Sequence, residues 1–320
     1  MKVLVTGSSG FIGSALVRAL AADRVSVAAL DRNPSKAIEG LAAAYVCDIL
    51  DADRLRFYVK EFSPEIIVHL AARADLDGST IQGYAANVDG VRNLLGAMRE
   101  AGTVRRAIWT SSQMVCRPGY VPRDQMDYQP HTIYGQSKVL TEKIVREEDS
   151  AGLEWCLVRP TTVWGPGMSA HYRRLLHMIA RGRYFHVGHG PYFKSYGYID
   201  NVVHEYRQVM RASAEQIHRR TFYLADYEPI DLVAWCDAFQ RALGGPPIRH
   251  MPRALAITLA RCGDAINMAG LRTFPFNSFR LNNVLTEYRF DMSATETICG
   301  PLPVNFHEGV AKTAKWFQAL

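Results

Sequence analysis

Tyr134, Lys138 and Ser112 are the residues of this chain whose types and spacing suggest catalysis. Tyr134 and Lys138 stand four positions apart in Tyr-Gly-Gln-Ser-Lys, and Ser112 precedes Tyr134 by 22 positions in Thr-Ser-Ser. Four positions make about one helical turn, so a phenol and an ammonium at this spacing share a helix face. The ammonium can lower the pKa of the phenol, and the serine hydroxyl can position a substrate oxygen. The three residues predict proton transfer at a carbon that bears a hydroxyl or a ketone.

A glycine-rich loop near the start of the chain supplies a partner for that chemistry. Gly7, Gly10 and Gly13 form the pattern GxxGxxG between an apolar strand and a helix. The glycines allow a tight turn and a close approach of the backbone to a pyrophosphate, and the helix N-terminus adds free N–H groups. A Tyr-x-x-x-Lys pair alone also occurs on ordinary helix surfaces. Together with this loop, it predicts hydride transfer to or from a nicotinamide dinucleotide.

Asp31 bears on the choice of dinucleotide. It ends the second predicted strand, 18 positions after Gly13. A carboxylate there accepts hydrogen bonds from the adenosine ribose hydroxyls and repels a 2′-phosphate, which favours NAD over NADP. Arg32 follows it and could meet a 2′-phosphate, so NADP stays possible, and an aspartate here could also serve only to form a turn. We expect NAD as the cofactor, NADP as the alternative, and no metal.

The elements that must hold these residues alternate between strands and helices. Apolar segments predict strands at 2–6, 25–30, 66–70, 106–110, 153–158 and 196–199. Helical spacing predicts helices at 13–22, 87–100, 133–148, 232–242 and 253–269, and another from residue 201. This alternation predicts an α/β fold, a Rossmann-type doubly wound parallel sheet with a smaller C-terminal substrate-binding domain. We place the NAD-binding domain at 1–165 and the mainly substrate-binding domain at 166–320, with about 196–226 returning to the first.

The composition is ordinary for a soluble globular enzyme, with 320 residues, 48% hydrophobic and 21% charged. The net charge is +6 without a basic run, so we expect small polyanions such as nucleoside diphosphates and no nucleic acid. The six cysteines form no CxxC pair and the first strand follows Met1 directly, which predicts free thiols and a cytoplasmic protein. Arg261 and Asp264 interrupt the apolar stretch 254–271, so it predicts an amphipathic helix and no membrane partner.

With these motifs together, the chain resembles the extended short-chain dehydrogenase/reductase family, in particular its nucleotide-sugar epimerases and dehydratases. The resemblance covers nearly the whole length and is carried by Thr6–Gly13, Cys47–Ile49, His69–Ala72, Asn87–Leu95, Thr110–Ser112, Tyr134–Lys138, Arg159–Pro160, Gly165–Gly167, Tyr198–Val203 and the tail from Phe290. It implies cofactor contacts from Gly7, Gly10, Phe11, Ile12, Gly13, Asp31, Arg32, Asp48, Ile49, Leu70, Ala71, Ala72, Asn87, Tyr134, Lys138 and Pro160. It also implies a homodimer formed through two helices of each subunit.

The substrate side departs from the pattern of that family. Thr162 stands where related epimerases carry asparagine, and Lys194 stands where the family has an arginine that grips the substrate diphosphate. Arg280 lies one position from a second expected arginine. We expect substrate contacts from Arg73, Ser112, Thr162, Lys194 and Arg280, while His171 either faces the sugar or is an ordinary exposed histidine.

The resemblance also ranks the possible reactions. Gln113 and Met114 follow Ser112, where sugar 4,6-dehydratases place an Asp-Glu pair, so water elimination is not expected. The leading hypothesis is a nucleotide-sugar 4-epimerase that retains NAD and uses Tyr134 as acid and base. The alternative is an NAD(P)H-dependent reductase of nucleotide 4-keto sugars, which would use the same three residues. A hydroxysteroid-type dehydrogenase and a non-catalytic NAD-binding regulator rank below both.

Overall fold

A seven-stranded parallel sheet forms the centre of the structure, a computed structural model that describes residues 1–33, 38–270 and 276–320. Its strands are β1 (Lys2–Thr6), β2 (Ser26–Asp31), β3 (Ala43–Val46), β4 (Ile66–His69), β5 (Arg106–Thr110), β6 (Glu154–Pro160) and β11 (Arg220–Leu224). Their order is β3-β2-β1-β4-β5-β6-β11, with every neighbouring pair parallel. The order reverses between β1 and β4, and in such sheets the ligand crevice lies at the carboxyl ends beside that reversal.

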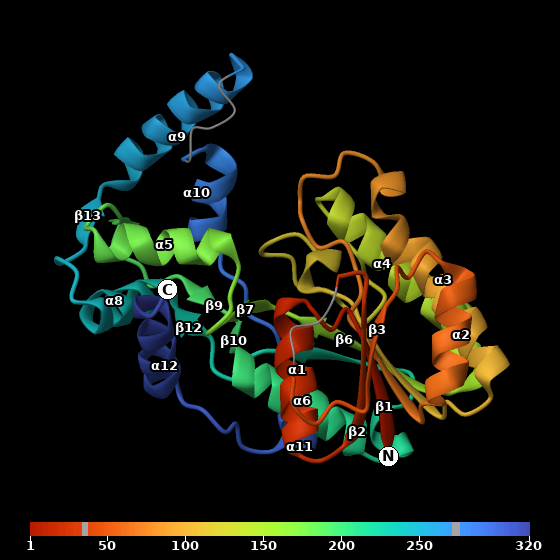
Figure 1. The fold of residues 1–320 in the computed structure, drawn as a ribbon. Coiled ribbons are helices and arrows are strands. Elements are labelled where there is room, and N and C mark those ends of the chain that lie inside the picture. The colour runs from red at the N-terminus through yellow and green to blue at the C-terminus, as the bar shows by residue number, and fades with distance from the viewer. Residues whose placement is uncertain (34–37, 271–275) are drawn as a thin grey trace.

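Helices cover both faces of the sheet, as Figure 1 shows. One layer contains α1 (Phe11–Ala22), α6 (Ile199–Arg211) and α11 (Ser293–Cys299), and the other contains α2 (Ala52–Phe62), α3 (Ala85–Ala101) and α4 (Ile133–Glu147). Successive residues of a strand point to opposite faces. Accordingly Val3 and Val5 belong to the hydrophobic cluster that includes α1, while Leu4 belongs to the cluster that includes α3. A parallel sheet buried on both sides explains why the first strand is apolar at every one of these positions.

A second, smaller lobe is built from short ribbons and helices. It contains β7 (Thr162–Trp164), α5 (Ala170–Ala180), β8 (Phe185–Val187), β9 (Phe193–Lys194), β10 (Tyr196–Tyr198), β12 (Ile230–Asp231), α8 (Leu232–Leu243), β13 (Arg249–Met251), α9 (Arg253–Met268), α10 (Ser278–Leu285) and α12 (Phe306–Gln318). Its aromatic core includes Trp164, Trp235 and Phe239, with ring centroids 4.5 to 5.8 Å apart. Helix α9 extends outward from this lobe and packs along α10 (Figure 1).

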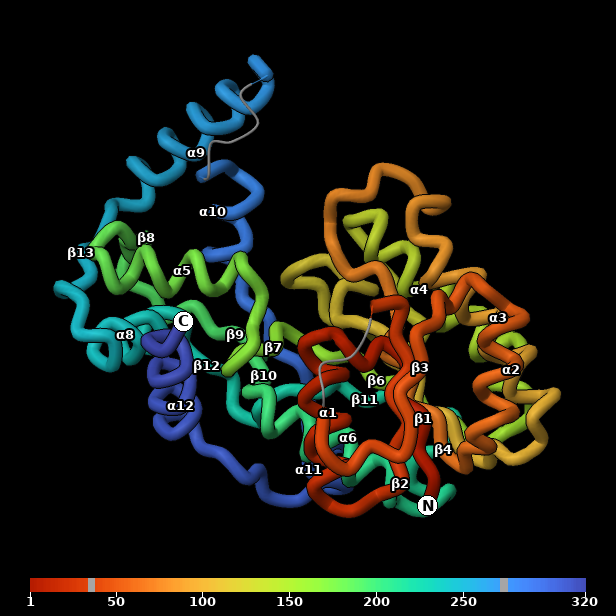
Figure 2. The backbone as a smooth tube through the Cα atoms, in the orientation of Figure 1, coloured from red at the N-terminus to blue at the C-terminus, as the bar shows by residue number. Residues whose placement is uncertain are grey.

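The chain crosses between the lobes more than once, which can be followed in Figure 2. After β10 it forms α6, which packs against α1, and then a short helix α7 (Ala214–Ile217) and the edge strand β11. It leaves again through β12 and α8, and returns as α11 to pack against α6. The sheet is therefore completed by a segment that follows the first part of the small lobe in sequence.

Glu205 is a buried carboxyl group at the point where α6 meets the end of β11. Its side chain is 0% exposed, and its oxygens make no hydrogen bond of normal geometry to a described residue, although the Ala225 amide lies nearby. Burial, and then the neighbouring Asp226 carboxylate, raises the pKa of Glu205 well above its ordinary value. Asp226 itself accepts hydrogen bonds from the Tyr198 amide and from Asn201, and burial raises its pKa to about 6. The fold therefore favours the protonated form of Glu205.

This burial predicts a pH-dependent gain in stability for Glu205→Gln. A carboxyl whose pKa is higher in the fold than in the unfolded chain loses folding stability as pH rises above the unfolded value of about 4.3. The glutamine variant removes that loss, so its Tm should exceed that of the wild type by at least ~2 °C at pH 8, with a smaller difference at pH 5. Glu228→Gln, which removes the same charge from an exposed position, should change neither value. A lower Tm for Glu205→Gln at pH 8 would contradict this account.

Candidate active site

The glycine loop between β1 and α1 fits the backbone tightly against the end of β4. Gly7 has φ +72°, and a Cβ at this position would lie 2.5 Å from the Ala71 nitrogen. At Gly13, a Cβ would lie 2.1 Å from the Gly7 carbonyl oxygen. Helix α1 begins after Gly10 without a side-chain cap, so its first N–H groups are left for a ligand. This small, uncapped cradle at the reversal of strand order suits a pyrophosphate.

Asp31 lies beside that cradle at the carboxyl end of β2. Its carboxylate accepts hydrogen bonds from the Ser9 amide at 3.0 Å and the Asn33 amide at 2.9 Å. These contacts fix an anion next to the loop, at the position where a dinucleotide's adenosine ribose is bound in this kind of sheet. Arg32, by contrast, is exposed. The arrangement agrees with residues 7–13 and Asp31 holding NAD, and Asp48 and Ile49 follow the neighbouring strand β3.

Asp31→Asn should weaken NAD binding and reduce discrimination against NADP. The variant keeps the size of the side chain but loses the charge that strengthens hydrogen bonds to the ribose. Hydrogen bonds to a charged group contribute about 1.5–3 kcal/mol, so the Kd for NAD should rise about 10–100-fold. Titration calorimetry with NAD and with NADP measures both effects, and Asp53→Asn, at an exposed position of α2, is the control. An unchanged ratio of the two Kd values would remove Asp31 from this role.

Tyr134 lies in the first turn of α4, directly beside Ser112. The helix starts at its N-cap Thr132, whose hydroxyl accepts the Gly135 amide at 3.0 Å. A Cβ on Gly135 would lie 2.3 Å from the Met114 carbonyl oxygen, so glycine lets the start of α4 press against the segment after Ser112. The Ser112 hydroxyl hydrogen-bonds to the Tyr134 phenol. The structure thus brings together two of the three residues predicted to act in proton transfer.

The pKa of Tyr134 moves upward in this structure, and not downward as the sequence suggested. Burial raises it to about 12, and the hydrogen bond from Ser112 opposes that rise. The Lys138 ammonium, which was expected to lower it, donates instead to the Thr110 carbonyl oxygen at 2.9 Å. Burial lowers the pKa of Lys138 to about 8, although the Glu142 carboxylate favours the charged form. At neutral pH the phenol is therefore protonated and can act as a proton donor.

An ion pair inside the protein holds the catalytic helix against β6. Glu142, one turn beyond Lys138, accepts two hydrogen bonds at 2.8 Å from the Arg159 guanidinium, and Tyr128 donates a third at 2.9 Å. Arg159 is 2% exposed and Glu142 is 0% exposed, so the pair is held out of water. A bidentate pair in this setting fixes distance and orientation together. It positions α4, and with it the Tyr134 and Lys138 side chains, relative to the sheet.

The remaining residues expected at the cofactor lie at adjacent strand ends. Leu70, Ala71 and Ala72 follow β4, and the Leu70 and Ala71 amides donate to Thr6. Pro160 ends β6. Asn87 is 0% exposed: its amide group bonds both backbone groups of Arg73 and the Ser137 hydroxyl. In this structure Asn87 joins the segment after β4 to α4, so its contribution is to position those elements.

The predicted substrate residues divide into two groups. Thr162 hydrogen-bonds to Tyr172 and lies 3.5 Å from the Gln113 amide nitrogen, next to Ser112. Arg280 is in the first turn of α10. Burial, and then the positive charges of Arg280 and Arg174, lower the pKa of His171.

Arg73 and Lys194 serve other contacts in this structure. The Arg73 guanidinium forms a bidentate pair with Asp75 and donates to the Gly83 carbonyl, which ties its own loop together. Lys194 is 1% exposed, and its ammonium donates to the Asn283 and Thr286 carbonyl oxygens at the end of α10. A lysine there compensates the free carbonyls of a helix C-terminus. In this structure the Lys194 ammonium therefore caps α10, and its contact with a substrate diphosphate stays a prediction.

Several residues near the site were not predicted from the sequence. The Tyr84 ring centroid lies 6.2 Å from that of Tyr134, and its hydroxyl donates to the Asp75 carbonyl at 2.8 Å. On the opposite side, Phe279 of α10 stacks near His131, just before the N-cap of α4. A tyrosine preceding a helix and a phenylalanine in a short helix carry no pattern that separates them from core residues. Only the tertiary contacts reveal them.

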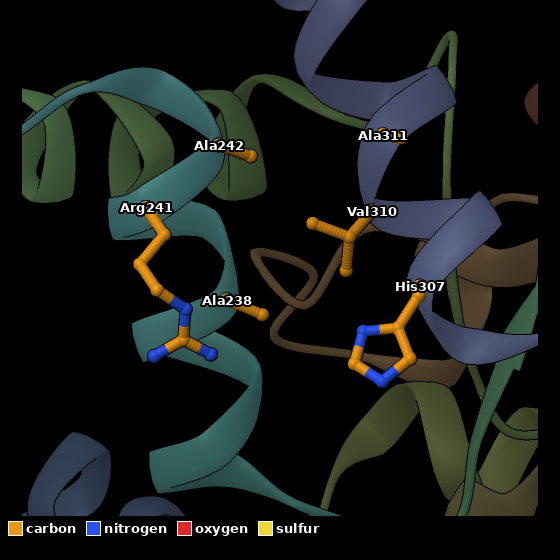
Figure 3. Close-up of a pocket in the computed structure, with 6 residues that line it drawn as sticks. All are labelled: Ala238, Arg241, Ala242, His307, Val310 and Ala311. Atoms are coloured by element: carbon orange, nitrogen blue, oxygen red, sulfur yellow. The ribbon is translucent and has the colours of Figure 1, made fainter.

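A hollow of about 390 Å³ between α8 and α12 is separate from this site (Figure 3). It is lined by Ala238, Arg241, Ala242, His307, Val310 and Ala311, and none of these residues belongs to the proton-transfer group or to the dinucleotide cradle. The candidate site residues lie instead at or after the carboxyl ends of β1, β4, β5 and β6.

The comparison with protein families shows to which family this chain belongs. The sequence profile of the NAD dependent epimerase/dehydratase family matches residues 3–225, which contain the glycine loop, Asp31, Ser112, Tyr134 and Lys138. The chain belongs to this family. It is accordingly an NAD-dependent enzyme of the extended short-chain dehydrogenase/reductase type.

Individual members of the epimerase/dehydratase family match over almost their full length. An N-acetyl-alpha-D-glucosaminyl-diphospho-ditrans,octacis-undecaprenol 4-epimerase of Escherichia coli O157:H7 is 25% identical over 98% of this chain and 95% of its own. A UDP-glucose 4-epimerase of Mycolicibacterium smegmatis is 29% identical over 99% of each chain. The crystal structure of UDP-glucose 4-epimerase from Thermotoga maritima with UDP-glucose has a TM-score of 0.77, covering 100% of this chain and 99% of that one at 22% identity. This last likeness shows the same fold.

Proposed function

We propose that this chain is a 4-epimerase of sugars carried on a diphosphate, with nucleotide sugars as the substrate class expected from its sequence. The observation that carries the proposal is the hydrogen bond between Ser112 and Tyr134, placed next to the dinucleotide cradle and followed by uncharged Gln113. This group can move a proton at a sugar hydroxyl, but it offers no acid/base pair for removing water. Two relatives that match over nearly their full length are named as 4-epimerases of sugars on a diphosphate, which supports the same choice.

In the proposed reaction, Tyr134 removes the proton of the C4 hydroxyl while hydride leaves C4. Ser112 holds the same oxygen in hydrogen-bond reach. When bound, NAD would supply a hydride acceptor and donor at C4, and its oxidised ring would bring a positive charge. A positive charge near a phenol lowers its pKa, which would counter the rise to about 12 caused by burial. After the 4-keto sugar turns its other face, hydride returns and Tyr134 gives the proton back to the oxygen.

The contacts of Lys138 suit a supporting role in this cycle. Its ammonium is 3% exposed and tied to the carbonyl of Thr110, the last residue of β5. A cation fixed at that strand end can donate hydrogen bonds to the hydroxyls of the nicotinamide ribose. The predicted homodimer has no bearing on this chemistry.

The test is turnover without added cofactor. The purified chain is denatured and the released nucleotide is identified by mass spectrometry, and the intact protein is incubated with UDP-glucose and UDP-N-acetylglucosamine deuterated at C4. We expect bound NAD, the C4 epimer as product, and deuterium retained at C4, because the hydride leaves and returns to the same carbon. Turnover that instead requires one NAD(P)H for each product, from a 4-keto sugar, would establish the reductase and refute the epimerase.

A further inference from the structure

The hollow between α8 and α12 exists because short side chains line both helices (Figure 3). Each helix turns one face toward it, through residues at positions i, i+3 and i+4: Ala238, Arg241 and Ala242 on α8, and His307, Val310 and Ala311 on α12. Alanine side chains are too short to fill the space between two packed helices, and three of them leave this opening. Neither these two helices nor any other helix of the described residues is long and apolar enough to cross a membrane.

The hollow has an apolar floor and two polar groups at one end. Ala238 is 6% and Val310 is 4% exposed, whereas Arg241 and His307 are exposed to solvent. In Figure 3 the Arg241 guanidinium and the His307 ring lie at the same end of the hollow, on opposite helices, while the two exposed alanines lie at the other end. A ligand in the hollow would therefore meet hydrogen-bond donors at one end and methyl groups at the other.

The two polar groups of the hollow have their donors available for a ligand. The Arg241 guanidinium forms no ion pair or hydrogen bond with the described residues, and Asp237, one turn earlier on α8, bonds to His186 at 2.9 Å instead. The ring nitrogens of His307 likewise bond to no described residue, although the ring packs beside Phe306. A guanidinium can bind two oxygens of a carboxylate or a phosphate side by side, and a histidine ring offers an N–H in either charge state. Both groups can therefore bind the same oxyanion.

The charge around the hollow favours an anion as its ligand. Helices α8 and α12 together contain three lysines and arginines and two acidic residues. Of these two, Asp237 is bound to His186, and Glu308 does not line the hollow. His307 lies in the first turn of α12, where the helix dipole adds positive potential. An apolar cation would gain nothing from Arg241, whereas an apolar anion would bind both the donors and the alanines.

The length of the hollow favours a small molecule over a protein segment. Its lining residues run only from i to i+4 on each helix, about one turn or 5.4 Å along the axis. A helix docked in a groove uses anchors from i to i+7, about two turns, and an added strand needs a sheet edge, which neither helix offers. The volume of about 390 Å³ falls within the range of about 300–1,000 Å³ that is typical of small-molecule sites.

A ligand in this hollow would join two helices that are far apart in the sequence and pack on the same aromatic core. Phe239, next to Ala238, lies 5.8 Å from Trp164, and a Cβ on Gly309 of α12 would lie 2.9 Å from the Trp164 ring. We propose that the hollow between α8 and α12 binds a small organic oxyanion, a carboxylate or a phosphate on a short apolar body, and that this ligand stabilises the small lobe. The site does not depend on the proposed epimerase reaction.

Calorimetry with simple probes tests the binding directly. Octanoate, octyl phosphate, octanol and octylamine are titrated separately into the purified protein, below the concentrations at which they form micelles. We expect octanoate or octyl phosphate to bind at least about tenfold more tightly than octanol and octylamine, because only an oxyanion accepts charged hydrogen bonds from Arg241. The tighter of the two anions identifies the preferred head group. Anions that bind no more tightly than octanol overturn the proposal.

Four variants determine whether the anion binds in this hollow. Arg241→Gln should weaken anion binding at least about tenfold, and Ala242→Leu/Ala311→Leu, which fills the hollow from two exposed positions, should abolish it. The matched controls are Arg220→Gln, at the exposed start of β11, and Ala254→Leu, at an exposed position of α9, and both should bind like the wild type. Saturating anion should raise the Tm of the wild type and of both controls, but not that of the filled variant. Anion binding of wild-type strength in either Arg241→Gln or the filled variant refutes the site.

Discussion

Tyr134→Phe should lower kcat by about 10²–10⁴-fold, the usual contribution of a positioned acid/base. The substitution removes the hydroxyl that hydrogen-bonds to Ser112 and leaves the ring in the first turn of α4. Because the close contacts of Gly7 and Gly13 are with Leu70, Ala71 and their own loop and not with Tyr134, NAD content should stay close to that of the wild type. Epimer formation by chromatography and nucleotide content by mass spectrometry measure the two quantities separately.

Tyr120→Phe is the matched control for that experiment. The Tyr120 hydroxyl donates to Asp127 at 2.8 Å in the loop before α4, so this variant also loses one phenol hydrogen bond. It should keep activity within a fewfold of the wild type, because that hydroxyl does not contact Ser112. If Tyr134→Phe also retained activity at that level, the proton would have to be carried by another group, and the proposed mechanism would fail.

Gly13→Ala should abolish NAD retention and lower stability, although alanine is the better helix former. The new methyl would lie 2.1 Å from the Gly7 carbonyl oxygen, so either α1 or the loop must move. Overpacking of this kind costs about 1–3 kcal/mol. The same movement displaces the N–H groups at the start of α1, and the purified variant should therefore contain no bound nucleotide.

Gly96→Ala makes the same substitution where the structure leaves room. Gly96 lies inside α3, and a Cβ there would have no other atom within 4 Å. Alanine in a helix interior is favoured over glycine by about 0.5–1 kcal/mol, so this variant should gain stability and keep its NAD. Thermal unfolding of both variants checks the opposite signs. A stable, NAD-containing Gly13→Ala protein would show that the loop can move freely.

The strands and the residues at their ends were predictable because buried parallel strands have a clear pattern. The strands ending at Thr6 and Thr110 have the predicted bounds, and α9 ends one residue before the predicted position. Strand β3 was missed because Ala43–Val46 is short and its residues are only half-buried or exposed at the sheet edge. Strand β11 and helix α2 were likewise not assigned in advance. Local sequence describes elements best when both their faces are buried.

The sequence predicted which residues form the candidate site better than it predicted which partners their side chains contact. Tyr134 and Ser112 meet as expected, because both are fixed by elements that the sequence reveals. The hydrogen-bond partners of the Lys194 ammonium depend on where α10 ends. The burial of Glu205 depends on how α6 packs on β11. Both are tertiary facts that no local pattern contains. A glutamate in a helix is usually exposed, so Glu205 gave no sign of its burial.

Strand β11 follows its partner β6 by about 60 residues in the sequence, which has a consequence for synthesis of the chain on the ribosome. The strand next to it, β6, ends at Pro160, but its partner is not made until Arg220–Leu224. At ordinary elongation rates of about 5–20 residues per second, several seconds separate the two. During that interval the nascent sheet has an open edge that could pair with another chain. We therefore expect this enzyme to be most vulnerable to aggregation while it is being translated, and least vulnerable once residue 224 has left the exit tunnel.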